Sequence, residues 1–98
     1  MEIANNIDRL ITEAVQMGGS DLHISVGAQP RVRIHGELQN MNYAIITPNI
    51  AETLFFPLLD TLAKSILNTN GQYDFAYSVH GVARLRCNVF KQKGDLAG

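Results

Sequence analysis

Residues 73–94 read YDFAYSVHGVARLRCNVFKQKG, and this stretch decides the fold. Apolar and polar residues alternate on both sides of His80 and Gly81, which predicts two antiparallel strands joined by a tight turn. Arg84, Arg86 and Asn88 are spaced by two, so their side chains share one face of the second strand. Four cations and no acid lie between positions 84 and 93. A charged row on an otherwise apolar strand indicates an anionic partner: a phosphate, a carboxylate or an acidic protein surface.

Upstream of this hairpin, the pattern predicts one helix and three strands. Apolar residues recur at helical spacing over residues 3–15, and Gly18–Gly19 ends that helix. Residues 21–26 and 31–35 alternate as strands, and a weaker alternation predicts a third strand over 38–41. Gly36–Glu37 is the expected centre of the turn between the second and third strands.

Two short helices are predicted between these strands and the hairpin. Thr47–Pro48 begins the first helix as N-cap and first residue, and Pro57 ends or kinks it. Asp60 caps the second helix, which runs through Asn68. The predicted fold class is α+β: one antiparallel sheet of about five strands with helices packed on one face. Residues 94–97 form a turn and the start of a further strand, so we expect that the sequence is cut just before the last strand.

The length, composition and net charge of the chain restrict the class of protein further. A chain of 98 residues with 46% apolar content forms one globular domain or part of one. The net charge of −1 argues against a general nucleic-acid binder. Cys87 is the only cysteine, which excludes an internal disulfide and favours a reducing compartment. The polar N-terminus is no signal peptide, and no apolar run is long enough to span a bilayer, so we expect a cytoplasmic chain.

Two blocks of sequence carry a resemblance to a known family. The first reads GSDLHISVG at 19–27, followed by Pro30, Arg33 and GEL at 36–38. The second is the hairpin, with DF at 74–75 and RLRCNVF at 84–90. In this order, with a helical segment begun by Thr47–Pro48 between them, they resemble the N-terminal domain of the type IV pilus retraction ATPases. These are the PilT-like twitching-motility motors of the secretion ATPase superfamily.

The resemblance implies a PAS-like N-terminal domain, residues 1–98, that precedes a RecA-like ATPase domain in a hexameric ring. It implies ATP and Mg²⁺ as cofactors of the intact motor, and a location at the pilus base beside the inner membrane. The implied partners are the neighbouring subunit's ATPase domain and the platform protein of the pilus, with no nucleic acid. The nucleotide-contacting residues carried over by position are Arg84, Arg86, Asn88, Gln92 and Arg33.

Part of the expected machinery lies outside this sequence. The chain contains no Gly-x-x-x-x-Gly-Lys-Ser/Thr loop to hold phosphates, so we expect no ATP hydrolysis from residues 1–98 alone and assign no catalytic residue to them. No cysteine or acid cluster supports His23, His35 and His80 as metal ligands. Leu85 and Cys87 depart from the family's usual phenylalanine and valine, which affects packing and leaves the arginine row unchanged.

Three alternatives remain open at this stage. The arginines could form surface ion pairs on a solvated strand, each worth about 0–1 kcal/mol. The chain could be a free-standing PAS-like sensor with a ligand pocket between sheet and helices. A small nucleic-acid binder is disfavoured by the net charge. For Asp74, a structural ion pair with a strand arginine is the preferred role.

Overall fold

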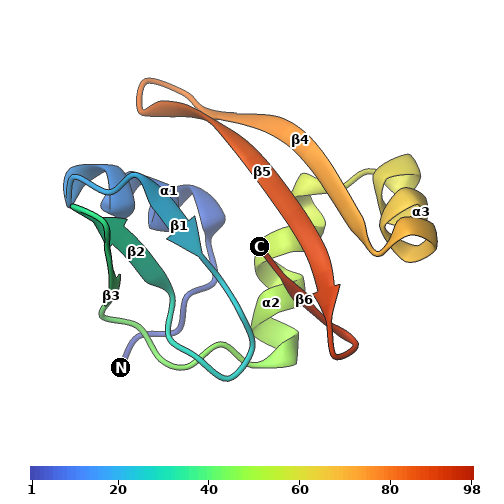
Figure 1. Ribbon diagram of the computed structural model, residues 1–98, viewed down its shortest axis with the longest axis horizontal. Coiled ribbons are helices and arrows are strands. Elements are labelled where there is room, and N and C mark those ends of the chain that lie inside the picture. The colour runs from blue at the N-terminus through green and yellow to red at the C-terminus, as the bar shows by residue number, and fades with distance from the viewer.

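The computed structural model describes residues 1–98, which form two three-stranded antiparallel sheets and three α-helices (Figure 1). The elements in chain order are α1 (Ile7–Gln16), β1 (Asp21–His23), β2 (Arg31–Ile34), β3 (Glu37–Asn40), α2 (Pro48–Phe55), the 3₁₀ turn η1 (Phe56–Leu58), α3 (Thr61–Asn70), β4 (Gln72–Val79), β5 (Ala83–Gln92) and β6 (Asp95–Ala97). The α+β class and the antiparallel pairing are confirmed. None of the helices is long and apolar enough to cross a membrane.

Local capping residues decide where the helices begin. The side chain of Asn6 accepts a hydrogen bond from the backbone N–H of Arg9, so α1 begins after Asn6 and not at Ile3 as predicted. Ile3 lies outside the helix and is exposed. Thr47 and Asp60 cap α2 and α3 in the same way, which confirms both predicted helix starts.

The first sheet has the order β1-β2-β3. Its β2–β3 turn lies one residue earlier than predicted, because Ile34 pairs with Glu37. His35 and Gly36 therefore form the turn, and both have positive φ (50° and 82°). Two positive φ values are typical of the type I′ turn, which matches the twist of a two-residue hairpin.

The second sheet has the order β4-β5-β6 and contains the predicted hairpin. Val79 pairs with Ala83 at its closed end, around His80 and Gly81. The start of a strand predicted near Leu96 is present as β6, where Leu96 pairs with Lys91.

The prediction of one continuous five-stranded sheet is wrong, since the six strands divide into two sheets. The predicted strand over 21–26 ends at His23, because Ile24 forms its backbone hydrogen bonds with Gly98 and not with β2. Ile24 and Gly98 exchange two backbone hydrogen bonds, with N···O distances of 2.7 and 2.9 Å. The chain's C-terminus thereby lies between β1 and β5 (Figure 1).

The core forms where the helices cover the inward faces of both sheets. Leu10 of α1, Leu54 and Phe55 of α2, Val32 of β2 and Val89 of β5 are all buried. These side chains belong to one cluster of 16 buried residues. The two sheets therefore share one core, which holds β5 in a fixed position beside β1.

We predict that Leu54→Ala lowers the free energy of unfolding by about 2–5 kcal/mol, because the side chain is fully buried and its removal leaves a cavity. Leu62→Ala is the matched control, since Leu62 is 69% exposed and a surface change costs at most about 0.5 kcal/mol. Urea unfolding of the two variants measures the difference. Equal losses of stability would contradict this packing.

Candidate functional site

The outer face of the β4–β5 hairpin carries the predicted row of polar side chains. Burial alternates along β5: Leu85 and Cys87 are partly buried, whereas Arg84, Arg86 and Asn88 are exposed. The structure thus agrees with the face assigned to these three residues from their spacing.

The cross-strand neighbours of the two arginines are small. Arg84 pairs with Ser78 and Arg86 with Ala76 on β4. Neither guanidinium forms a hydrogen bond or an ion pair within the chain, whose ion pairs involve Arg9, Arg33 and His23. Both cations are therefore available to an external anion.

Asn88 differs from the arginines because its amide is already engaged. Its Nδ2 donates to Asp74 Oδ1 at 2.7 Å and, more weakly, to Gln72 Oε1 at 3.4 Å. Asp74 lies directly opposite Asn88 in the strand register, which explains the contact. The expected ion pair between Asp74 and a strand arginine is therefore wrong, because the Asp74 carboxylate accepts a hydrogen bond from the Asn88 amide instead.

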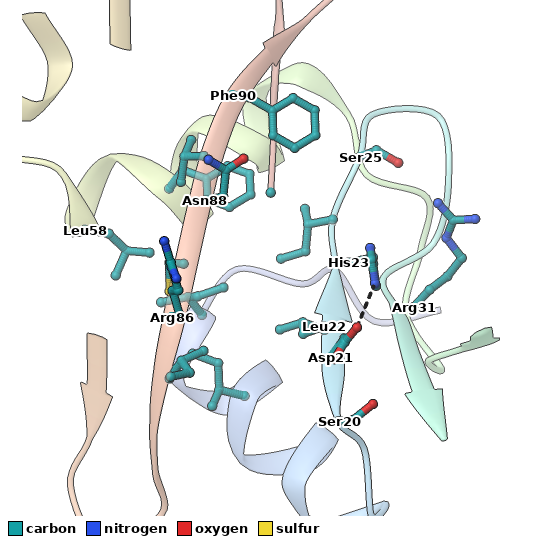
Figure 2. A pocket seen from close by; sticks show the side chains of 18 of the residues that line it. Ser20, Asp21, Leu22, His23, Ser25, Arg31, Leu58, Arg86, Asn88 and Phe90 are labelled. Atoms are coloured by element: carbon teal, nitrogen blue, oxygen red, sulfur yellow. Dashed lines mark ion pairs between the residues drawn. The ribbon is translucent and has the colours of Figure 1, made fainter. Parts of the chain in front are cut away.

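A groove of about 730 Å³ lies between β1 and β5 (Figure 2). Its two long walls are residues 20–25 and 84–90, and helix side chains such as Ile11 and Leu58 form its floor. Arg84, Arg86, Asn88 and Gln92 all line it, so the structure gathers four of the five predicted nucleotide-contacting residues along one wall. Figure 2 shows Arg86 and Asn88 on β5, across the groove from β1, where Asp21 and His23 are labelled.

Arg33 is the predicted residue that the structure places elsewhere. It does not line the groove. Its Nε lies 3.4 Å from Asp21 Oδ2, and its Nη1 donates to the carbonyl oxygen of Gly36 at 3.1 Å. Arg33 therefore braces the first sheet at its β2–β3 turn.

Arg31 lines the groove in place of Arg33 and was not singled out from the sequence. It pairs with His23 across β1 and β2. Its Nε is buried without a hydrogen-bond partner, as is His23 Nε2, which lies 3.8 Å from Asp21 Oδ2. Strand alternation puts Arg31 and Arg33 on the same face of β2. Only their different partners on β1, His23 and Asp21, decide which of the two arginines lines the groove.

The charge of the groove is positive overall. Three arginines and one acid line it: Arg31, Arg84, Arg86 and Asp21. Asp21 is shared between Arg33 and His23. The arrangement suits a ligand with several anionic oxygens, because guanidinium stays charged and presents forked donors.

Cys87 belongs to the buried side of β5. Burial raises the pKa of its thiol above the ordinary value, so the neutral form is favoured. This agrees with a packing role and not with a nucleophile. No group of three or more His, Cys, Asp or Glu side chains is placed to hold a metal ion.

Tyr77 ties the hairpin to α1. Its hydroxyl donates to Asp8 Oδ1, which joins two segments 69 residues apart in sequence. This hydrogen bond and burial raise the pKa of Tyr77 from 10.0 to about 12. The contact helps to hold the arginine-bearing hairpin over the first helix.

The fold of this chain is similar to part of two ATPases of known structure. No family model matches the sequence. The solved structure of the pilus retraction motor PilT with bound ADP superposes with a TM-score of 0.87 at 35% identity, over 94% of this chain and 27% of that one. The ATPase DotB of Legionella pneumophila shares the fold, with a TM-score of 0.76 at 19% identity over 92% of this chain and 26% of that one.

Two curated proteins are similar to the chain in sequence along most of its length. The chain is 29% identical over 87 residues to the type IV pilus retraction ATPase PilT of Pseudomonas aeruginosa, covering 89% of this chain and 25% of that protein. It is 34% identical over 92 residues to the uncharacterized protein YggR of Escherichia coli, covering 94% of this chain and 27% of that protein. The chain is homologous to the N-terminal region of the pilus retraction ATPase PilT, which confirms the resemblance read from its motifs. It spans about a quarter of the length of these relatives.

The Tyr77–Asp8 contact predicts how stability depends on pH. The Tyr77 phenol ionises near pH 10 in the unfolded chain and near pH 12 in the folded one. The contribution of the Tyr77–Asp8 contact to the free energy of unfolding is therefore complete below pH 10 and is lost as pH rises from about 10 to about 12. Tyr77→Phe is expected to lose less stability than the wild type over this range, measured by urea unfolding at several pH values. Parallel decreases in the two proteins would contradict the linkage.

Proposed function

We propose that this chain is the N-terminal domain of a hexameric ATP-driven motor that retracts type IV pili in twitching motility. The proposal rests on the homology to the N-terminal region of PilT together with the exposed, unpaired Arg84 and Arg86. In this proposal the domain regulates the ring and contributes to its assembly.

The proposed chemical role of the outer β5 face is to contact nucleotide held by a neighbouring subunit. Arg84 and Arg86 bind phosphate oxygens through their forked N–H groups, and Gln92 adds a neutral donor near the same wall. Asn88 reaches the nucleotide only by releasing Asp74, so we assign it a secondary part. Arg33 stays within the first sheet and is expected to act indirectly, by holding Asp21.

The outer face of β5 suits the phosphates of ATP better than it suits Mg²⁺. The arginines match the charge and geometry of phosphate oxygens. Magnesium prefers carboxylate and water oxygens, and the one acid on this part of the hairpin, Asp74, is bound to Asn88. We therefore assign the metal and most of the nucleotide site to a separate ATPase domain, and expect no hydrolysis by residues 1–98 alone.

The arginines couple the nucleotide to domain movement in this proposal. Bound ATP draws the hairpin toward its phosphates, and hydrolysis with phosphate release removes the attraction. A ligand that binds one arrangement of two rigid bodies more tightly shifts their equilibrium toward it. The expected setting is the cytoplasmic side of the pilus base, with the inner-membrane platform protein as a further partner.

The sensor alternative gains no support from the pocket. A small-ligand sensor needs a pocket lined mainly by apolar groups. The groove walled by β1 and β5 instead carries three arginines. We therefore favour the motor domain over the sensor.

The proposal predicts that Arg84→Ala and Arg86→Ala each lower ATP turnover of the full-length motor by at least about tenfold. The full effect of an arginine finger in other phosphoryl-transfer enzymes is about 10³–10⁵. Steady-state phosphate release measures the ATP turnover of each variant. Arg86→Lys separates the positive charge of the side chain from its paired N–H donors, because lysine keeps the charge and lacks the forked guanidinium geometry.

Lys91→Ala is the matched control for these variants. Lys91 is an exposed cation on the same strand, but it lies on the opposite face from Arg84 and Arg86 and does not line the groove. Its turnover is expected to stay within about twofold of wild type, as for surface cations in general. Wild-type turnover in both arginine variants would refute the nucleotide role.

A further inference from the structure

A row of three side chains with hydrogen-bond donors crosses the first sheet on its outer face. Arg31, on the central strand β2, pairs with His23 on β1 and with Asn40 on β3. Arg31 alternates with the buried Val32, so this row faces away from the core. Neighbouring strands lie about 4.8 Å apart, so the Cβ atoms of the three residues lie within about 10 Å of one another. We call His23, Arg31 and Asn40 the donor row.

The next row of the same sheet has its own acid, and the donor row has none. Arg33 pairs with Asp21 on β1. Its Nε lies 3.4 Å from Asp21 Oδ2, and its Nη1 donates to the carbonyl oxygen of Gly36. None of the ion pairs of the chain includes Arg31. The Asp21 oxygen that lies 3.8 Å from His23 Nε2 is the one already shared with Arg33.

Two nitrogens of the donor row are buried and lack a hydrogen-bond partner. They are Arg31 Nε and His23 Nε2, and no other buried side-chain nitrogen or oxygen of the chain lacks a partner. Buried polar groups are normally satisfied, so such an exception calls for an explanation. Arginine carries donors only, so Arg31 needs an acceptor. The chain supplies none, which indicates an acceptor from outside the chain.

The groove gives an external acceptor access to the donor row. His23 and Arg31 line it on the side of β1 and β2, across from β5 (Figure 2). Both residues are half-buried, so each still presents part of its side chain to the groove. Ser25 also lines this side and adds a hydroxyl close to His23 in sequence.

We propose that the donor row is a binding site for a phosphate group, either free or at the end of a small phosphorylated molecule. The guanidinium of Arg31 binds two phosphate oxygens through its forked N–H groups, and His23 and Asn40 donate from either side. Binding draws Arg31 and His23 toward the groove, so their buried nitrogens gain the acceptor that they lack.

A phosphate suits this row better than a carboxylate does. Phosphate presents its oxygens in a tetrahedral arrangement, so the fork of Arg31 and the two flanking donors can each reach one. A carboxylate has two oxygens in one plane, and the fork alone occupies both. The carboxylate of Asp21 lies beside the row and leaves both buried nitrogens without a partner.

The proposed phosphate site is separate from the arginines of the hairpin. Arg84 and Arg86 belong to β5, on the opposite wall of the groove, and form no part of the donor row. The inference therefore does not depend on the proposed contact of those two arginines with nucleotide.

Titration of inorganic phosphate into the 98-residue chain tests the proposal. The Nε–Hε signal of Arg31 in proton–nitrogen NMR spectra reports on the buried nitrogen directly. Phosphate is expected to shift this signal to a plateau. Arg31→Gln is expected to raise the Kd at least about tenfold, read from the backbone amides of His23 and Asn40, because a charge-assisted, forked contact is lost. His23→Gln is the second variant, which also weakens binding and keeps the test informative if Arg31→Gln does not fold.

Matched controls separate a specific site from general charge effects. Lys64→Gln also removes one positive charge, but Lys64 lies on α3 and outside the groove, so the Kd is expected to stay within about twofold of wild type. Sodium chloride and sodium acetate at the same ionic strength are the control ions. ADP, followed at the same Arg31 signal, identifies the source of the phosphate: tighter binding than inorganic phosphate indicates a nucleotide, and equal binding indicates free phosphate.

Four results would overturn the proposal. The first is the absence of a saturable shift at Arg31 with either phosphate or ADP. The second is an equal shift with chloride, which means screening, and the third is an equal shift with acetate, which means a carboxylate site. The fourth is binding that Arg86→Gln abolishes and Arg31→Gln leaves intact, since this result assigns the phosphate to the β5 wall. That last result leaves the nucleotide role of Arg86 standing, so the two proposals fail separately.

Discussion

Successive residues of β5 point to opposite faces of its sheet, and the rest of the structure depends on this alternation. Val89 is buried against the helices, and Leu85 and Cys87 continue the same inward side. Their burial fixes the rotation of the strand, because a slip by one residue would expose all three and bury charged groups. Arg84 and Arg86 are consequently forced outward, where nothing in the chain neutralises them.

The same constraint explains why the charged face is stable without internal ion pairs. A solvated guanidinium costs the fold little, and an exposed ion pair would add at most about 1 kcal/mol. Ser78 and Ala76, opposite the two arginines, neither shield nor engage them. Tyr77 and Asp8 hold the hairpin to α1 from its buried side, so the outer face is positioned without using its own polar groups.

Local features of this fold were predictable from the sequence, and non-local ones were less so. The caps at Thr47 and Asp60 act within one helical turn, so both helix starts were predicted. The turn at His35 was placed one residue late because a non-glycine residue there adopts a positive φ. The way in which the two sheets meet depends on the backbone hydrogen bonds between Ile24 and Gly98, 74 positions apart, which no local pattern encodes.

The candidate site shows the same limit. Spacing alone placed Arg84, Arg86 and Asn88 on one exposed face, whereas the choice between Arg31 and Arg33 depends on which residues of β1 lie opposite them. The hydrogen bond from Asn88 to Asp74 likewise follows from the register of β4 and β5, which places the two residues opposite each other. The register depends on the position of the turn between the strands, which the sequence alone does not fix.

The most direct measurement is a structure of the full-length protein, the proposed motor, with Mg²⁺ and a non-hydrolysable ATP analogue. The account predicts guanidinium nitrogens of Arg84 or Arg86 within about 3 Å of a phosphate oxygen bound by a neighbouring subunit. Guanidinium groups that face solvent, or pair with protein carboxylates, in every nucleotide-bound subunit would contradict it.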